Sequence, residues 1–152
     1  MRHGAQWKSQ RVVAAVAGMM AAAVVLGGCT SGSRVDAGLP EYPIELRQTT
    51  VLDVQVVRDD THITMTNTTA RSIGKARMWV NGWYSRDIAG FGVGESVTLS
   101  LFDFKDAYGT PFRAGGFFAT ERPDRLVLAQ LEPLDVEPRE LLGLVVVGRG
   151  DE

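Results

Sequence analysis

In the stretch SVTLSLF at residues 96–102, hydroxyl and apolar side chains alternate strictly from Ser96 to Leu101. A period of two places the apolar residues on one face and the polar residues on the other, which is typical of a half-buried β-strand. HITMTN at residues 62–67 has the same period, with Ile63 and Met65 on one face. Six more short runs of strand-forming residues occur at 50–58, 75–80, 83–88, 111–120, 125–131 and 141–147. We therefore predict an all-β fold of seven to eight strands, arranged as an antiparallel sandwich or barrel.

Turn-forming residues separate these runs. Asn81-Gly82 lies between two apolar runs, and both residue types tolerate a positive φ, so we predict a two-residue type I′ hairpin there. This hairpin would place Trp83 opposite Val80. The pair Gly115-Gly116 lies inside the run 111–120 and indicates a bulge or a close approach of the backbone.

The composition is that of one ordinary globular domain. The chain has 152 residues, a formal net charge of −2, 22% charged residues and 45% apolar residues. These values exclude a wholly disordered chain, a collagen-like repeat and a basic nucleic-acid binder, so we expect no nucleic-acid partner.

The first 28 residues have the order of a secretory signal. Arg2, Lys8 and Arg11 precede an uncharged run at 12–28, and no acidic residue occurs before it. We predict a helical signal peptide at residues 1–28. The alternative is an uncleaved anchor helix, although the apolar run is short for a membrane span, which needs about 20 residues.

The end of this run, Leu26-Gly27-Gly28-Cys29, contains the only cysteine of the chain. It resembles the lipobox of bacterial lipoprotein precursors. The resemblance implies diacylglycerol on the Cys29 thiol, cleavage before Cys29 and acylation of the new amino terminus, and therefore a membrane partner. Thr30 follows the cysteine, and in an organism with two membranes this resembles the outer-membrane sorting pattern.

Beyond the anchor, residues 29–40 lack periodicity and contain Gly, Ser, Asp and Pro, which predicts a flexible tether before a domain at 41–152. Within that domain, ITMTN, RMWVNG and GESVTLSL at 63–67, 77–82 and 94–101 resemble small immunoglobulin-like domains of bacterial envelope proteins. The resemblance implies an antiparallel Ig-like β-sandwich. No cysteine pair of the antibody type is present.

Residues that could carry chemistry are few. His62 is the only histidine after the signal, and a catalytic or metal-binding histidine needs partners. Asp103 and Asp106 favour a turn over a calcium site, because Lys105 lies between them. We expect no enzyme activity, no cofactor and no metal site.

Aromatic residues are dense between Trp79 and Phe118. We expect most of them to fill the core and a few to form a contact surface. The predicted hairpin places Arg77, Trp79, Tyr84 and Arg86 on one exposed face, because two opposed arginines are costly to bury. A Trp–Tyr pair between arginines is a candidate site for a glycan or a partner protein. The alternatives are that Trp79 is a core residue or is covered by the C-terminal segment.

Together these patterns predict a lipid-anchored module of the cell envelope that binds a protein or a polysaccharide and catalyses no reaction. We expect it on the outer membrane, facing the periplasm, if the organism has two membranes. A small envelope hydrolase, an inhibitor domain and a structural subunit of an envelope complex are the alternatives.

Overall fold

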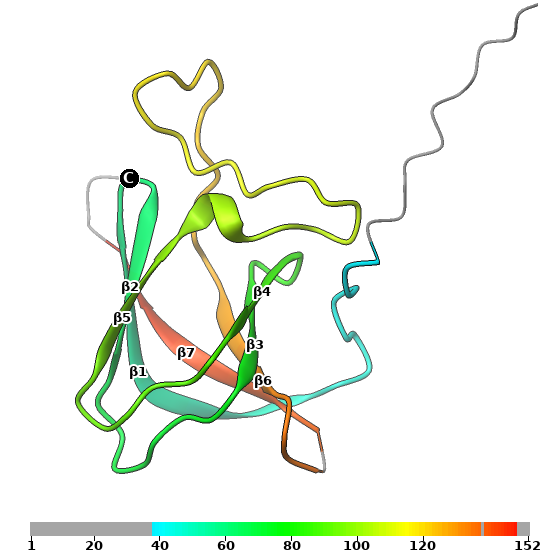
Figure 1. Ribbon diagram of the computed structural model, residues 1–152, viewed down its shortest axis with the longest axis vertical. Coiled ribbons are helices and arrows are strands. Elements are labelled where there is room, and N and C mark those ends of the chain that lie inside the picture. Colours follow the sequence, from blue (N-terminus) through cyan, green and yellow to red (C-terminus); the bar gives the residue numbers. More distant parts are fainter. Residues whose placement is uncertain (1–37, 138, 149–152) are drawn as a thin grey trace, which may run out of the picture. The chain divides into compact units, whose positions relative to one another are not determined.

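The computed structural model describes residues 38–137 and 139–148 (Figure 1). The predicted signal peptide, Cys29 and the tether up to residue 37 lie outside the described residues. The described elements are β1 (Gln48–Asp59), β2 (His62–Asn67), β3 (Ala76–Val80), β4 (Tyr84–Ile88), β5 (Ser96–Ser100), the short 3₁₀ helix η1 (Leu101–Asp103), β6 (Ala129–Pro133) and β7 (Leu141–Val147). The predicted all-β class is confirmed.

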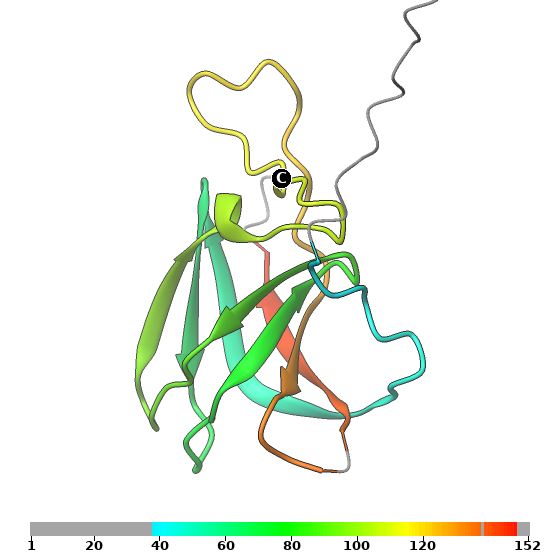
Figure 2. The same cartoon turned by 45° about the vertical axis from the view of Figure 1, so that its right-hand side comes forward.

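The strands form one curled sheet that resembles half a barrel (Figures 1 and 2). Its strand order is β4-β3-β6-β7-β1-β2-β5. Every neighbouring pair is antiparallel except β1 and β7, which run parallel. The pairing therefore differs from the predicted antiparallel sandwich of separate sheets.

The long strand β1 explains this difference. It has 12 residues and pairs with β2 on one side and with β7 on the other. Its pairing with β7 shifts register between Val51 and Gln55, and such irregularities bend a strand. One bent strand thus keeps both halves of the structure in a single sheet.

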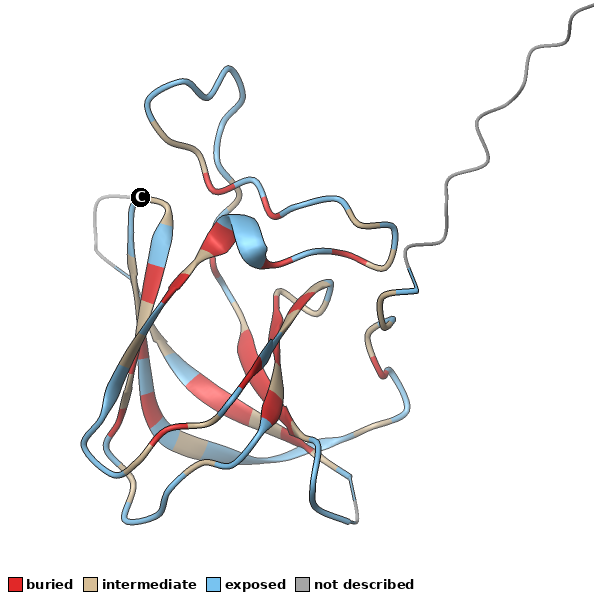
Figure 3. Cartoon of the chain, viewed as in Figure 1, coloured by how far each residue is buried: buried red, intermediate tan, exposed pale blue. Residues whose placement is uncertain are grey.

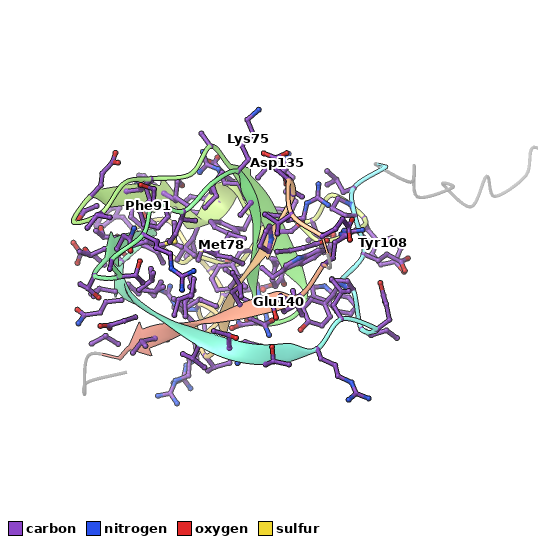
Figure 4. The ribbon with its side chains drawn as sticks, turned by 90° about the horizontal axis from the view of Figure 1, so that it is seen from below. Lys75, Met78, Phe91, Tyr108, Asp135 and Glu140 are labelled. Carbon is purple, nitrogen blue, oxygen red and sulfur yellow. The ribbon has the colours of Figure 1, made fainter. Side chains whose placement is uncertain are left out.

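The core lies on the concave face of the sheet (Figure 3). Ile63 and Met65 of β2 are fully buried, and Leu99 of β5 is nearly so, which confirms the inward faces predicted from their alternation. Met78 lies in the interior of the half-barrel (Figure 4). Burial of such large apolar side chains supplies the main stabilisation of a domain whose described part contains no cysteine.

A second packed layer covers the convex face of β3 and β6. Trp79 is 1% exposed, and its indole Nε1 donates to Glu132 Oε2 at 2.9 Å. The Tyr42 ring packs edge-on against Trp79 with centroids 5.4 Å apart, and its hydroxyl donates to Gln130 Oε1 at 2.9 Å. The buried Glu132 carboxylate also accepts a hydrogen bond from Arg139. The segment before β1 is therefore part of the folded domain.

A long connection, residues 104–128, spans one end of the half-barrel between η1 and β6 (Figure 1). Phe104 and Phe112 are buried in the core, and Lys105 pairs with Ser85 of β4 through hydrogen bonds of 2.8 and 3.1 Å. The predicted strand at 111–120 is wrong, because these residues form a loop. The predicted strand at 125–131 begins later, at Ala129.

Candidate functional site

The hairpin between β3 and β4 has the predicted turn residues but a different register. Asn81 and Gly82 have φ values of 55° and 64°, and the Trp83 amide donates to the Val80 carbonyl at 3.1 Å. The strands, however, pair Val80 with Tyr84 rather than with Trp83. Trp83 is thus an extra loop residue, and the predicted register is wrong by one.

The side chain of Asn81 ties the turn to the backbone of residues 125–128. Its Oδ1 accepts the amides of Val127 and Leu128 at 2.9 and 3.2 Å, and its Nδ2 donates to the Arg125 carbonyl at 2.7 Å. The turn is therefore fixed by the chain that leads into β6, and these contacts between distant residues leave no local sequence signal.

A shift by one residue exchanges the two faces of β4, because side chains alternate along a strand. Tyr84 consequently points into the core side and packs edge-on against Phe112 at 5.2 Å. Burial raises the pKa of Tyr84, and the nearby carboxylates of Asp124 and Asp106 add to this effect. Arg86 lies on the same side of β4 as Tyr84.

The four residues predicted to form one exposed binding face are therefore not brought together. Trp79 is buried, and Tyr42 of the segment before β1 packs against its ring. Arg77 lies on the same face of β3 as Trp79, and its guanidinium pairs with the Asp87 carboxylate of β4 at 2.7 Å. Arg86 pairs with Asp103 at 2.7 Å. The predicted exposure of a Trp–Tyr pair between arginines is wrong.

The structure exposes aromatic residues elsewhere, at the tip of the segment 113–124. We call this whole segment the aromatic loop; it projects from one end of the half-barrel (Figure 2). Phe117 and Phe118 are 96% and 91% exposed, and their rings contact each other edge-on with centroids 5.0 Å apart. Gly115 and Gly116 precede them with φ values of 88° and 107°, a backbone conformation that favours glycine. No charged residue occurs between Ala114 and Thr120. The tip is thus a neutral, apolar projection.

The base of the aromatic loop is closed by an ion pair. The Asp124 amide donates to the Arg113 carbonyl at 2.9 Å, and the Arg113 guanidinium donates to the Asp124 carboxylate at 2.7 Å. Glu121 adds a third contact to Arg113 at 3.0 Å. Hydrogen bonds with these two carboxylates raise the pKa of Arg113. The loop therefore leaves and rejoins the domain at one point.

Arg58 of β1 fixes this base to the sheet. Its guanidinium donates to the carbonyl oxygens of Ala114 and Asp124, one on each side of the loop base, at 2.7 and 2.5 Å. Its Nε donates to the Asp60 carbonyl at 2.9 Å, and its guanidinium carbon lies 5.9 Å from the centre of the Phe112 ring. One cation thus holds together a strand, a turn and both ends of the aromatic loop.

A groove of about 650 Å³ lies beneath the tip. The β1–β2 turn, Phe102 of η1 and the aromatic loop line it. Phe102 is 48% exposed, so apolar surface continues from the tip into the groove. The described residues that line the groove include no histidine, cysteine or serine. The lining also includes the carboxylates of Asp60 and Glu121 and the guanidinium of Arg113 at its polar part.

His62 and Asp106, the remaining candidates, make contacts with residues close to them in the chain. His62 is exposed at the start of β2, and its Nδ1 lies 3.1 Å from the Thr61 hydroxyl. Asp106 Oδ1 accepts the amides of Tyr108 and Thr110 at 2.9 and 2.8 Å, which is turn chemistry. Among the described residues, no group of three or more His, Cys, Asp or Glu side chains is placed to hold a metal ion.

Within residues 38–137 and 139–148, no helix has the length and hydrophobicity needed to cross a membrane. The sequence matches no protein-family model, and comparisons with curated proteins and with solved structures find no match.

Proposed function

We propose that this chain is a lipid-anchored interaction module of the cell envelope that binds a partner protein through its aromatic loop and catalyses no reaction. The observation that carries the proposal is the near-complete exposure of Phe117 and Phe118 on a loop whose base is fixed by Arg58 and Arg113. Aromatic residues, phenylalanine included, and arginine are enriched at the centres of protein–protein interfaces. A loop that is held in place before binding loses less conformational entropy when the partner docks.

Several features favour a protein over a polysaccharide as the partner. The rings of Phe117 and Phe118 are at 90° to each other, so they offer no flat platform for successive sugar rings. Neither ring carries a hydrogen-bonding group, and the neutral tip has few polar side chains to bind sugar hydroxyls. Two adjacent apolar side chains that project from a surface instead suit a hydrophobic cleft on another protein.

The anchor part of the proposal rests on the signal-like residues 1–28 and on Cys29. A tether over residues 29–40 has a maximum length of about 40 Å when fully extended, which keeps the domain close to the membrane. Two or more acyl chains anchor a protein stably, whereas one does so marginally. We place the protein on the outer membrane, facing the periplasm, in an organism with two membranes.

The anchor is tested by Cys29→Ser in the full chain. We expect the variant to leave the membrane fraction or to accumulate as an unprocessed precursor. Mass spectrometry that finds Cys29 unmodified in the mature wild-type protein would remove the anchor from the proposal.

We also propose that the curled sheet is a variant of the immunoglobulin-like sandwich. The groups β1-β2-β5 and β4-β3-β6-β7 then correspond to the two facing sheets, which stay joined through the parallel pair β1–β7. The fold by itself adds little to the functional argument, because such sandwiches serve many functions.

The contact surface is tested by replacing both tip residues, Phe117→Ser and Phe118→Ser, in the anchored protein. Because both rings are exposed, we expect the melting temperature to stay unchanged while cross-linking to the partner in intact envelopes is lost. The matched control is Val93→Ser with Val127→Ser, which also removes two exposed apolar side chains, 59% and 70% exposed, outside the loop. Equal loss in both variants, or retention in both, would contradict the proposal.

A further inference from the structure

The two ends of the sheet differ in how their edges are covered. On the outer side of β4, Ser85 exchanges both backbone hydrogen bonds with Lys105. On the outer side of β5, none of the described residues pairs with the strand. In Figure 2, β5 forms the left-hand border of the sheet.

The pairing of β5 with β2 shows which backbone groups face outward. The Asn67 amide donates to the Glu95 carbonyl at 3.0 Å, and the Leu101 amide donates to the Thr61 carbonyl at 2.9 Å. In an antiparallel pair, backbone groups alternate between the two sides of a strand. Val97 and Leu99 therefore bond to β2, and the N–H and C=O groups of the residues between them face away from the sheet. These residues are Ser96, Thr98 and Ser100.

This edge lacks the charges, prolines and bulges that commonly keep exposed strands apart. Residues 96–102 contain no charged residue and no proline. All five residues of β5 pair with β2 in an unbroken register, so no bulge turns the edge away. Natural edge strands are usually protected by charges, prolines or bulges, and an unprotected edge offers a template for another strand.

We propose that β5 is a self-association site, where a second copy of this chain adds its own β5 in antiparallel orientation, centred on Thr98. The two-fold pairing places Thr98 opposite Thr98 and Ser96 opposite Ser100 of the second copy. Both copies then present the same outward N–H and C=O groups to each other, as an isologous interface requires. Glu95 comes opposite Leu101 of the second copy, so no acidic residue faces another acidic residue.

The side chains on both faces of the strand suit this pairing. On the core side, Val97 comes opposite Leu99 of the second copy, so the half-buried Val97 gains apolar cover. On the outer side, hydroxyl pairs already join Thr64 to Thr98 at 3.0 Å and Thr66 to Ser96 at 2.8 Å. The second copy extends this row of hydroxyl groups. A second copy is thus a better match than a charged segment of another protein.

The register makes a sharp cross-linking test possible in the full chain with Cys29→Ser. Opposed residues of a backbone-bonded antiparallel pair have Cα atoms about 5.5 Å apart, within the range that a disulfide bridges. We expect Thr98→Cys to form a disulfide-linked dimer under mild oxidation. Ser96→Cys alone is the matched control, because the two copies of residue 96 lie too far apart to react. A mixture of Ser96→Cys and Ser100→Cys chains should cross-link again.

A charge on the edge provides the complementary test. Thr98→Lys places two like charges opposite each other, and we expect it to weaken self-association by about tenfold or more, as measured by light scattering. At concentrations low enough for both proteins to be monomers, we expect the two melting temperatures to be equal. Equal cross-linking of Thr98→Cys and Ser96→Cys, or a monomer at all concentrations, would overturn the proposal. Cross-linking of Thr98→Cys to a different envelope protein in place of itself would also overturn it. None of these outcomes involves the aromatic loop, so the proposed function is tested separately.

Discussion

Removal of the Arg58 guanidinium should release the aromatic loop from the sheet. We consider Arg58→Met, which keeps a long apolar stem but removes the three hydrogen bonds to backbone carbonyls. A hydrogen bond to a charged group contributes about 1.5–3 kcal/mol, and a buried carbonyl left without a partner adds a penalty. The Ala114 carbonyl belongs to a residue that is 1% exposed. Because Arg58 itself is only partly buried, we expect a loss of about 2–4 kcal/mol in the free energy that holds the loop closed.

Hydrogen exchange measures this loss directly at the loop base. The Asp124 amide donates to the Arg113 carbonyl when the loop is closed, so its exchange reports opening. A loss of 3 kcal/mol corresponds to an exchange rate about 100 times faster. Arg122→Met is the matched control, because it makes the same substitution at an exposed position of the same loop.

Two results would refute this reasoning. The first is Asp124 exchange in Arg58→Met that is no faster than in Arg122→Met. The second is a free energy of unfolding within about 0.5 kcal/mol of the wild type, which is the range of ordinary surface substitutions. Either result would mean that Arg58 does not hold the loop.

Three further predictions concern the domain that carries the loop. Asn67→Leu should lower the free energy of unfolding in urea by about 3–5 kcal/mol, because the fully buried amide makes four hydrogen bonds that leucine cannot replace. Gly90→Ala should cost about 3 kcal/mol or more, since its Cβ would lie 2.3 Å from the Ile73 carbonyl oxygen, whereas Gly94→Ala, which has open space around it, should cost about 1 kcal/mol. Above pH 10.0, stability should fall as pH rises, because Tyr84 ionises at its ordinary pKa when unfolded and at a higher pKa when folded; Tyr84→Phe should reduce this dependence, and an identical pH profile would contradict it.

The sequence predicts strands well where the alternation of side chains alone decides the structure. HITMTN at 62–67 coincides with β2, and β5 lies within SVTLSLF at 96–102, because in both runs every second side chain is apolar and turned to the core. The run LLGLVVV at 141–147 also coincides with β7, although it is continuously apolar rather than alternating. The hairpin shows the limit of such reasoning. Asn81-Gly82 predicts the turn, but the contacts of Asn81 with residues 125–128 fix the register, and no local pattern encodes them.

The aromatic residues show why the site was harder to predict than the fold. Phe112 and Phe117 belong to the same run of strand-like residues, yet one is buried in the core and the other is almost fully exposed. The distinguishing signal is Gly115-Gly116, which indicates a break in the run rather than a bulge in a strand. Trp79 was predicted to be exposed but is buried. Tyr42, which packs against it, belongs to a segment before β1 that shows no periodic pattern, so the sequence gives no sign of this contact.

The central claim, that the tip of the aromatic loop contacts a partner protein, is tested most directly by photo-cross-linking in intact envelopes. A benzophenone amino acid replaces Phe117 in one variant and Val93, which is exposed outside the loop, in another. We predict a discrete protein adduct from position 117 that is absent from position 93 and that disappears when Phe118→Ser is added. No protein adduct at position 117, or adducts with lipid or polysaccharide only, would contradict the account.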